Sequence, residues 1–233
     1  MSNSIPEQKG KLFIVPTPIG NLEDVTIRSL RILKEVNLIA AEDTRVSKIF
    51  LNHYEIKTQL ISFHSFNEQS RKHQLIEKLK NGELIAIISD AGTPGISDPS
   101  FSIIDLAIKN NIPIEVLPGP TALIPALVIS GLPTHHFKFV GFLPHKKGRK
   151  NLIDKLRIEE STLIFYESPH RIKKTLNELL ISWGFRKAVL VREISKMFEE
   201  VIRGDLNFLN SISNSRVFKG EIVLIVEGNQ EIS

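Results

Sequence analysis

The feature that most constrains the fold is an alternation of short apolar runs with longer amphipathic stretches. The runs are rich in β-branched and aromatic residues and nearly continuous in hydrophobicity, which is typical of strands buried on both faces. The predicted strands are Leu12–Val15, Leu38–Ala41, Leu84–Ser89, Ile114–Leu117, Phe137–Phe142, Thr162–Tyr166, Ala188–Val191 and Glu221–Val226. Strands that alternate with helices indicate an α/β fold.

Several of the intervening stretches carry helix signals. The stretch Asn67–Asn81 has helical periodicity and stops before Gly82, a residue favoured after helix ends. Asp98 followed by Pro99 predicts an N-cap and the first position of a helix, and Ser168–Pro169 repeats that signature.

A change of lobe is predicted near the middle of the chain. The segment Leu117–Thr121 contains two prolines and a glycine, which restrict the chain and make it the best hinge candidate. We therefore expect an N-terminal α/β lobe at residues 1–119 and a C-terminal α/β lobe at residues 120–233.

Composition narrows the class of protein. Hydrophobic residues make up 42% and charged residues 24%, as in ordinary globular domains. The absence of cysteine excludes disulfides and thiolate zinc sites, and no His and carboxylate set has metal-ligand spacing, so no metal is expected. The polar start of the chain and the lack of an apolar run of roughly 20 residues predict a cytoplasmic protein without membrane contact. A net charge of +4 permits a polyanionic partner without requiring one.

The most informative loop is Ser89–Pro99, with the sequence SDAGTPGISDP. It follows a predicted buried strand, and ligands in open α/β sheets bind beyond the carboxyl ends of strands. Its glycines allow close approach of the backbone to a ligand, and Asp90 offers a hydrogen-bond acceptor. An ordinary turn is the competing interpretation, but density in Gly, Pro, Ser and Asp favours a binding loop. It matches neither the Walker pattern nor a full GxGxxG, so those motifs give no support to a nucleoside triphosphate or NAD.

Other polar segments follow predicted strands. The loop Pro16–Asn21 and the block Glu42-Asp43-Thr44-Arg45 each fit a ligand site and a solvated turn equally well. Glu167 and His170 follow another strand, and Arg192-Glu193 a further one, which together predict a polar rim around one cleft. The basic segment His145–Lys150 is most simply a solvated loop, but it is also the natural contact for RNA phosphates.

Taken in order, these segments resemble the tetrapyrrole methylase superfamily, and within it the bacterial ribosomal RNA small subunit methyltransferase I family. The matching blocks are Val15–Leu22, Ala41–Arg45, Ser89–Pro99, Leu117–Ala126, Gly141–Pro144, Phe165–Arg171, Arg192-Glu193 and Gly220–Gly228.

The resemblance implies two α/β lobes with S-adenosylmethionine in the cleft between them, usually in a homodimer. It implies cofactor contacts from the central loop, the lobe junction and the second lobe: Asp90, Gly92, Thr93, Ile96, Ser97, Thr121, Ala122, Tyr166 and Glu167. The implied substrate is 16S ribosomal RNA in the small ribosomal subunit, with contacts from Asn21, Lys146, Lys147, Arg149 and Lys150. Similar proteins commonly continue past the last strand into a small helical extension. If that extension binds RNA, we expect a weaker affinity for RNA in this chain.

The family reaction is methylation of the 2′-hydroxyl of a cytidine in the decoding region. The hypothesis for this chain is that Glu42 or Asp43 orients or deprotonates that hydroxyl, while Arg45 holds a phosphate. Two alternatives remain open. One is a corrinoid or tetrapyrrole C-methyltransferase, and the other is a non-catalytic RNA- or nucleotide-binding module on the same fold.

Overall fold

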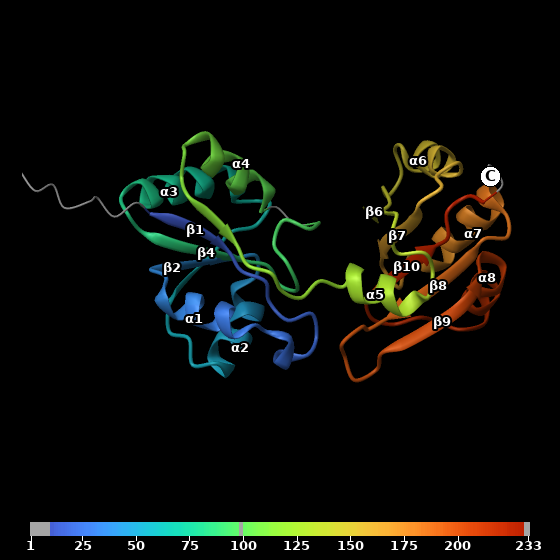
Figure 1. Cartoon of the computed structure of the whole chain (residues 1–233), viewed down its shortest axis with the longest axis horizontal. Coiled ribbons are helices and arrows are strands. Elements are labelled where there is room, and N and C mark those ends of the chain that lie inside the picture. The colour runs from blue at the N-terminus through green and yellow to red at the C-terminus, as the bar shows by residue number, and fades with distance from the viewer. Residues whose placement is uncertain (1–9, 98–99, 231–233) are drawn as a thin grey trace, which may run out of the picture. The chain divides into compact units, whose positions relative to one another are not determined.

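The computed structural model describes residues 10–97 and 100–230. The chain divides into two compact units, Met1–Thr121 and Ala122–Ser233, so the division falls two residues beyond the predicted hinge boundary after Gly119. Each unit is a sheet covered by helices on both faces (Figure 1). The predicted α/β fold is confirmed.

Unit 1 is a parallel sheet with the strand order β3-β2-β4-β1-β5. Its strands are β1 (Lys11–Ile14), β2 (Leu38–Ala41), β3 (Gln59–Ser62), β4 (Leu84–Ile88) and β5 (Ile114–Val116). Its helices are η1 (Leu22–Asp24), α1 (Ile27–Glu35), α2 (Thr44–His53), α3 (Glu68–Lys80) and α4 (Phe101–Lys109).

The helices of unit 1 lie on opposite faces of the sheet, α1 and α2 on one and α3 and α4 on the other (Figure 1). Leu33 and Phe50 pack in the first core, and Leu75 and Ile103 in the second. The connection from β4 to α4 therefore leaves toward the face opposite to the one used by the connections from its neighbours β1 and β2. Such a divergence of connections opens space at the carboxyl edge of a parallel sheet.

Unit 2 is a mixed sheet with the strand order β6-β7-β10-β8-β9, in which only β6 and β7 run parallel. Its strands are β6 (Phe137–Phe142), β7 (Thr162–Glu167), β8 (Lys187–Arg192), β9 (Glu200–Asp205) and β10 (Ile222–Val226). Its helices are α5 (Leu123–Ser130), α6 (Arg149–Leu156), α7 (Ile172–Trp183) and α8 (Leu206–Ser215). Helix α5 covers one face, and α6, α7 and α8 cover the other.

The eight predicted strands are all present, with ends shifted by a residue in most cases, whereas β3 and β9 were missed. Both are edge strands with half-buried or exposed residues, so neither carries a continuous apolar run. The predicted helix at Asn67–Asn81 is confirmed as α3.

Two predicted helix starts differ from the structure or fall outside it. The N-cap at Asp98 lies outside the described residues, and α4 begins at Phe101. The start at Ser168–Pro169 is wrong, because α7 begins at Ile172. Residues 168–171 form a turn instead, in which the Ser168 hydroxyl accepts a hydrogen bond from the His170 N–H.

No helix in the described part of the chain is long and apolar enough to cross a membrane.

Candidate functional site

The carboxyl edge of the unit 1 sheet gathers the polar loops that follow β1, β2 and β4. The loop after β1 and the loop after β4 are joined by an antiparallel bridge between Thr17 and Gly92, with hydrogen bonds of 2.9 and 3.0 Å in the two directions. The Thr17 hydroxyl also donates to the carbonyl oxygen of Ser89 at 3.0 Å. These bonds fix the two loops side by side.

The loop after β4 is built from backbone conformations that few residues adopt. Gly92 has a φ of +84°, and a Cβ there would lie 3.3 Å from Cγ2 of Ile19. Ser97 has a φ of +70°, which is costly for a residue with a side chain. The Thr93 hydroxyl donates to the carbonyl oxygen of Pro120 at 2.9 Å, which ties the loop to the end of the unit. Backbone strain of this kind is concentrated at ligand-binding sites.

The turn from β2 into α2 brings three predicted site residues together. Asp43 is the N-cap of α2, and its carboxylate accepts hydrogen bonds from the backbone and the guanidinium of Arg45, the shortest at 2.6 Å. The Asp43 N–H in turn donates to Oδ1 of Asp90 at 2.9 Å. The ends of β2 and β4 are thus linked through two predicted site residues from different motifs.

The two carboxylates of this link have pKa values displaced in opposite directions. Hydrogen bonds from the Arg45 side chain and backbone lower the pKa of Asp43 to about 2. Asp90 is exposed, but partial desolvation is the main cause that raises its pKa; the Asp43 N–H bond opposes this and the charge of Asp43 adds to it. A carboxylate with a pKa near 2 is a weak proton acceptor at neutral pH, and Asp43 is also engaged as the cap of α2 and in the pair with Arg45.

A pocket of about 190 Å³ lies among these loops. The residues that line it come from the β1 loop, α2 and the end of β4: Thr17, Pro18, Gly20, Leu22, Val46, Ser47, Ile49, Phe50, Ser89 and Asp90. Of these residues only Asp90 was predicted by itself as a site residue, whereas Thr17, Pro18, Gly20 and Ser89 lie in loops predicted as candidate sites. Ser47 and Phe50 lie one and two helical turns beyond Asp43, so helical spacing was the one signal that could have placed them there.

The remaining predicted residues of unit 1 also lie at this edge. Asn21 is the N-cap of η1 and accepts a hydrogen bond from the Glu23 N–H. Glu42 is half-buried directly after β2, and Ile96 is 41% exposed in the β4 loop. Thr121 ends the unit.

In unit 2, the predicted residues at the end of β7 are held by their own surroundings. Tyr166 packs edge-on against Phe139 with ring centroids 4.9 Å apart. The Glu167 carboxylate is buried, with one oxygen 2.6 Å from the Thr175 hydroxyl and the other accepting from the Ser168 N–H at 2.9 Å. Ala122 occupies the N-cap position of α5.

The predicted basic RNA contact needs one correction. Lys146, Lys147 and Lys150 are exposed, but Arg149 is only 4% exposed. Its guanidinium donates to Glu178 at 2.6 Å and to the Thr175 hydroxyl at 2.7 Å. Arg149 is therefore bonded within unit 2, and its guanidinium is not presented at the surface as the neighbouring lysines are.

Among residues 10–97 and 100–230, no group of three or more His, Cys, Asp or Glu side chains is arranged to hold a metal ion.

Comparison with known proteins places these features in a family. Residues 11–209 match the model of the tetrapyrrole (corrin/porphyrin) methylases. The chain is 48% identical over 226 residues to a protein of Halalkalibacterium halodurans named ribosomal RNA small subunit methyltransferase I, covering 97% of this chain and 78% of that protein. A protein of the same name from Thermotoga maritima is 42% identical and is covered completely, by 95% of this chain.

Solved structures share the fold at low sequence identity. A diphthine synthase superposes with a TM-score of 0.73 at 14% identity, covering 94% of this chain and 90% of that one. Uroporphyrin-III C-methyltransferase from Thermus thermophilus, solved with S-adenosyl homocysteine, superposes with a TM-score of 0.65 at 19% identity, covering 93% of this chain and 97% of that one.

Proposed function

The chain belongs to the tetrapyrrole (corrin/porphyrin) methylase family, and from that premise we propose that it methylates ribosomal RNA of the small subunit. The proposed reaction transfers the methyl group of S-adenosylmethionine to the 2′-hydroxyl of a cytidine in the decoding region of 16S ribosomal RNA. The observation that carries the proposal is the convergence of the β4 loop and the β2–α2 turn at one sheet edge, joined by the Asp43–Asp90 hydrogen bond. The names of the relatives from H. halodurans and T. maritima support the choice of acceptor.

The β4 loop fits the amino-acid part of the cofactor. A Cβ at Gly92 would crowd the Ile19 side chain at 3.3 Å, and the Thr93 hydroxyl is already engaged with Pro120. The loop is thus suited to contact a ligand mainly through backbone groups at Gly92, Thr93, Ile96 and Ser97. Because the loop is already held by Thr17 and Pro120, little ordering entropy is lost when a ligand binds.

The residues of the chain act by positioning and by accepting a proton. The bound cofactor supplies an electrophilic methyl carbon. Good alignment of the ribose hydroxyl with that carbon contributes roughly 7–11 kcal/mol to lowering the barrier. We assign the acceptance of the hydroxyl proton to Glu42, since Asp43 caps α2 and pairs with Arg45. General-base assistance contributes roughly 10²–10⁴-fold. Arg45, with its side chain 89% exposed, is available to an RNA phosphate.

The experiment is methyl transfer from labelled S-adenosylmethionine to small ribosomal subunits that lack the modification, followed by nuclease mapping. Label at one 2′-O-methylcytidine is the expected result. Label on uroporphyrinogen III but not on RNA would favour a tetrapyrrole C-methyltransferase instead. Cofactor binding without transfer to either acceptor would favour a non-catalytic module.

The role of Glu42 is tested with Glu42→Gln and Asp43→Asn under single-turnover conditions. Glu42→Gln is expected to lower the rate by roughly 10²-fold or more, with cofactor affinity unchanged. Asp43→Asn is expected to lower it less, because Asn is also a good N-cap. Equal rates for Glu42→Gln and the unaltered protein would overturn the assignment.

A further inference from the structure

The pocket beside the β4 loop has apolar walls. Leu22, Val46 and Ile49 are each at least 36% exposed, and Phe50 is nearly buried behind them. Exposed apolar side chains grouped around a hollow mark a binding surface rather than ordinary surface composition. At about 190 Å³ the pocket is smaller than the roughly 300–1,000 Å³ typical of sites for drug-sized ligands, so it suits a single ring system and not a whole cofactor.

The polar groups of the pocket fall into two sets. The hydroxyls of Thr17 and Ser89 donate to backbone carbonyl oxygens at 3.0 and 3.1 Å, so their protons are used within the protein. The Ser47 Oγ is different, because it is buried and has no hydrogen-bond partner among the described residues. A buried hydroxyl without a partner is costly, and Ser47 is one of the residues that line the pocket.

Asp90 supplies the second polar group. Its Oδ1 accepts one hydrogen bond, from the Asp43 N–H, and a carboxylate has acceptor capacity for several more. The pocket thus combines a carboxylate acceptor, a hydroxyl that can donate or accept, and apolar side chains that can contact the faces of a ring.

We propose that this pocket receives a cytosine base of the substrate RNA, unstacked from its neighbours, with its exocyclic amino group donating to Asp90 and a ring acceptor taking the hydroxyl proton of Ser47. The inference rests on the proposed RNA methylation and adds the group that selects the nucleotide. It also assigns Asp90 to the substrate, whereas the family resemblance implied a cofactor contact.

The chemistry of the base edge explains the choice. Cytosine carries an amino donor next to an acceptor nitrogen, which complements a carboxylate beside a hydroxyl donor. Uracil carries a carbonyl oxygen where cytosine has the amino group, so it would face the carboxylate with a second acceptor. Enzymes that modify nucleic acids commonly read a nucleotide by taking it out of the stack and bonding its pairing edge.

The first test fills the pocket. Val46→Phe adds an aromatic ring at the rim on an exposed side chain, and Ile108→Phe makes a similar change on α4, away from the pocket. In the full-length protein, Val46→Phe is expected to lower kcat/KM for small ribosomal subunits at least tenfold and to leave the dissociation constant for S-adenosylmethionine unchanged. Ile108→Phe is expected to change neither.

The second test changes the readout of the base. Small subunits are reconstituted with cytidine or uridine at the target position, and the ratio of the two kcat/KM values is measured. The unaltered protein is expected to prefer cytidine by roughly tenfold or more, as for a good base contact. Asp90→Asn is expected to reduce that ratio, because an amide can also donate to the uracil oxygen, while cofactor affinity is retained.

The outcomes separate the two proposals. If the unaltered protein labels no small-subunit RNA, the proposed function fails and the pocket assignment falls with it. If the protein is active but Val46→Phe transfers methyl groups normally, or Asp90→Asn keeps the full preference for cytidine, only the pocket assignment is overturned. Weaker cofactor binding by Asp90→Asn would indicate that Asp90 contacts the cofactor, as the family resemblance implied.

Discussion

The backbone N–H of Asp43 donates a hydrogen bond to the Asp90 carboxylate across 2.9 Å, although the two residues are 47 positions apart in the chain. The bond joins the ends of two neighbouring parallel strands, β2 and β4. It places the carboxylate of the β4 loop beside the cap of α2, where the bond itself favours the ionised form of Asp90 against the larger opposing effect of desolvation.

Asp90 is expected to make stability depend on pH in an unusual direction. Its pKa is raised in the folded protein, so the folded state binds this proton more tightly than the unfolded state does. The stability from Asp90 is present below its unfolded pKa and is lost as the pH rises through its folded pKa. Asp90→Asn removes a partly desolvated charge, so at pH 7 it is expected to unfold at an equal or slightly higher urea concentration than the unaltered protein. That advantage should disappear on acidification; a constant difference at all pH values would contradict the prediction.

Asp43 is expected to behave in the opposite way. Its pKa is lowered to about 2, first by the Arg45 side chain, so its contribution is present above the unfolded pKa and is lost as the pH falls toward 2. Arg45→Ala is expected to move the pKa of Asp43 back toward 3.8, measured from the carboxyl ¹³C shift in NMR titrations. Arg31→Ala, which removes the partner of Glu35, serves as control and should leave Asp43 unchanged.

Gly92 is expected to couple stability to cofactor binding. An alanine at φ +84° costs roughly 1–2 kcal/mol, and its Cβ would press on Ile19. Gly92→Ala should therefore lower the free energy of unfolding and weaken S-adenosylmethionine binding in calorimetry. Gly131→Ala is the matched control, since Gly131 has a φ of +75° at the end of α5 with no atom near the added Cβ. A comparable loss of cofactor affinity in Gly131→Ala would show that strain alone is responsible.

Arg149 is expected to matter for stability and not for RNA affinity. Its removal leaves Glu167 buried with fewer partners, and breaking a buried charge network costs roughly 3–5 kcal/mol. Urea unfolding of Arg149→Ala should show that loss, whereas the exposed Lys150→Ala should stay within about 0.5 kcal/mol of the unaltered protein. If Arg149→Ala has normal stability but weakened RNA binding, the phosphate contact predicted from the sequence would be supported instead.

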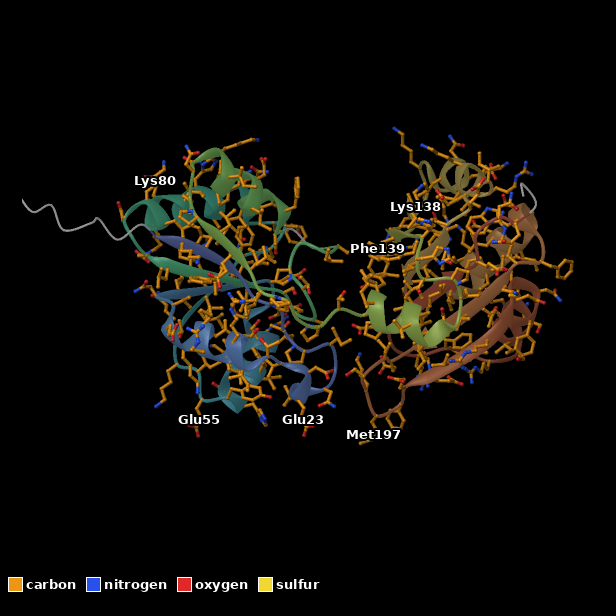
Figure 2. The ribbon with its side chains drawn as sticks, in the orientation of Figure 1. Glu23, Glu55, Lys80, Lys138, Phe139 and Met197 are labelled. Atoms are coloured by element: carbon orange, nitrogen blue, oxygen red, sulfur yellow. The ribbon has the colours of Figure 1, made fainter. Side chains whose placement is uncertain are left out.

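The exposed lysines of the same loop are expected to govern salt dependence. If Lys146 and Lys147 each neutralise a phosphate, each alanine variant should lower the slope of log affinity against log salt by about 0.7–0.9. Lys80→Ala is the control, because Lys80 lies on α3 of unit 1 (Figure 2) and its ammonium pairs with the Glu77 carboxylate at 2.9 Å. Equal slopes for all three variants would show that Lys146 and Lys147 do not contact RNA phosphates.

Elements with local signals could be predicted from the amino-acid sequence. The buried strand Leu38–Ala41 carries a continuous apolar run, so its position was predicted to the residue. The edge strand Phe137–Phe142 was also predicted to the residue, because its aromatic and β-branched residues favour a strand although Lys138 interrupts the apolar pattern. The loop after β4 was predicted as a binding loop from its Gly, Pro and Ser residues at the end of a strand. The backbone preferences of these residues are local, so they can be recognised from the sequence alone.

Which of these elements come into contact depends on tertiary packing and could not be predicted from local patterns. The edge strands β3 and β9 gain their conformation from pairing with β2 and β8, which no local pattern records. Arg149 reads as one more cation in a basic loop, yet packing of α6 on α7 buries it beside Glu178. The place of Ser47 at the pocket likewise depends on the strand order that sets β4 between β1 and β2. Strand order and burial arise from contacts between segments that are distant in the sequence. The free energies of those contacts cannot be read from a short stretch of neighbouring residues.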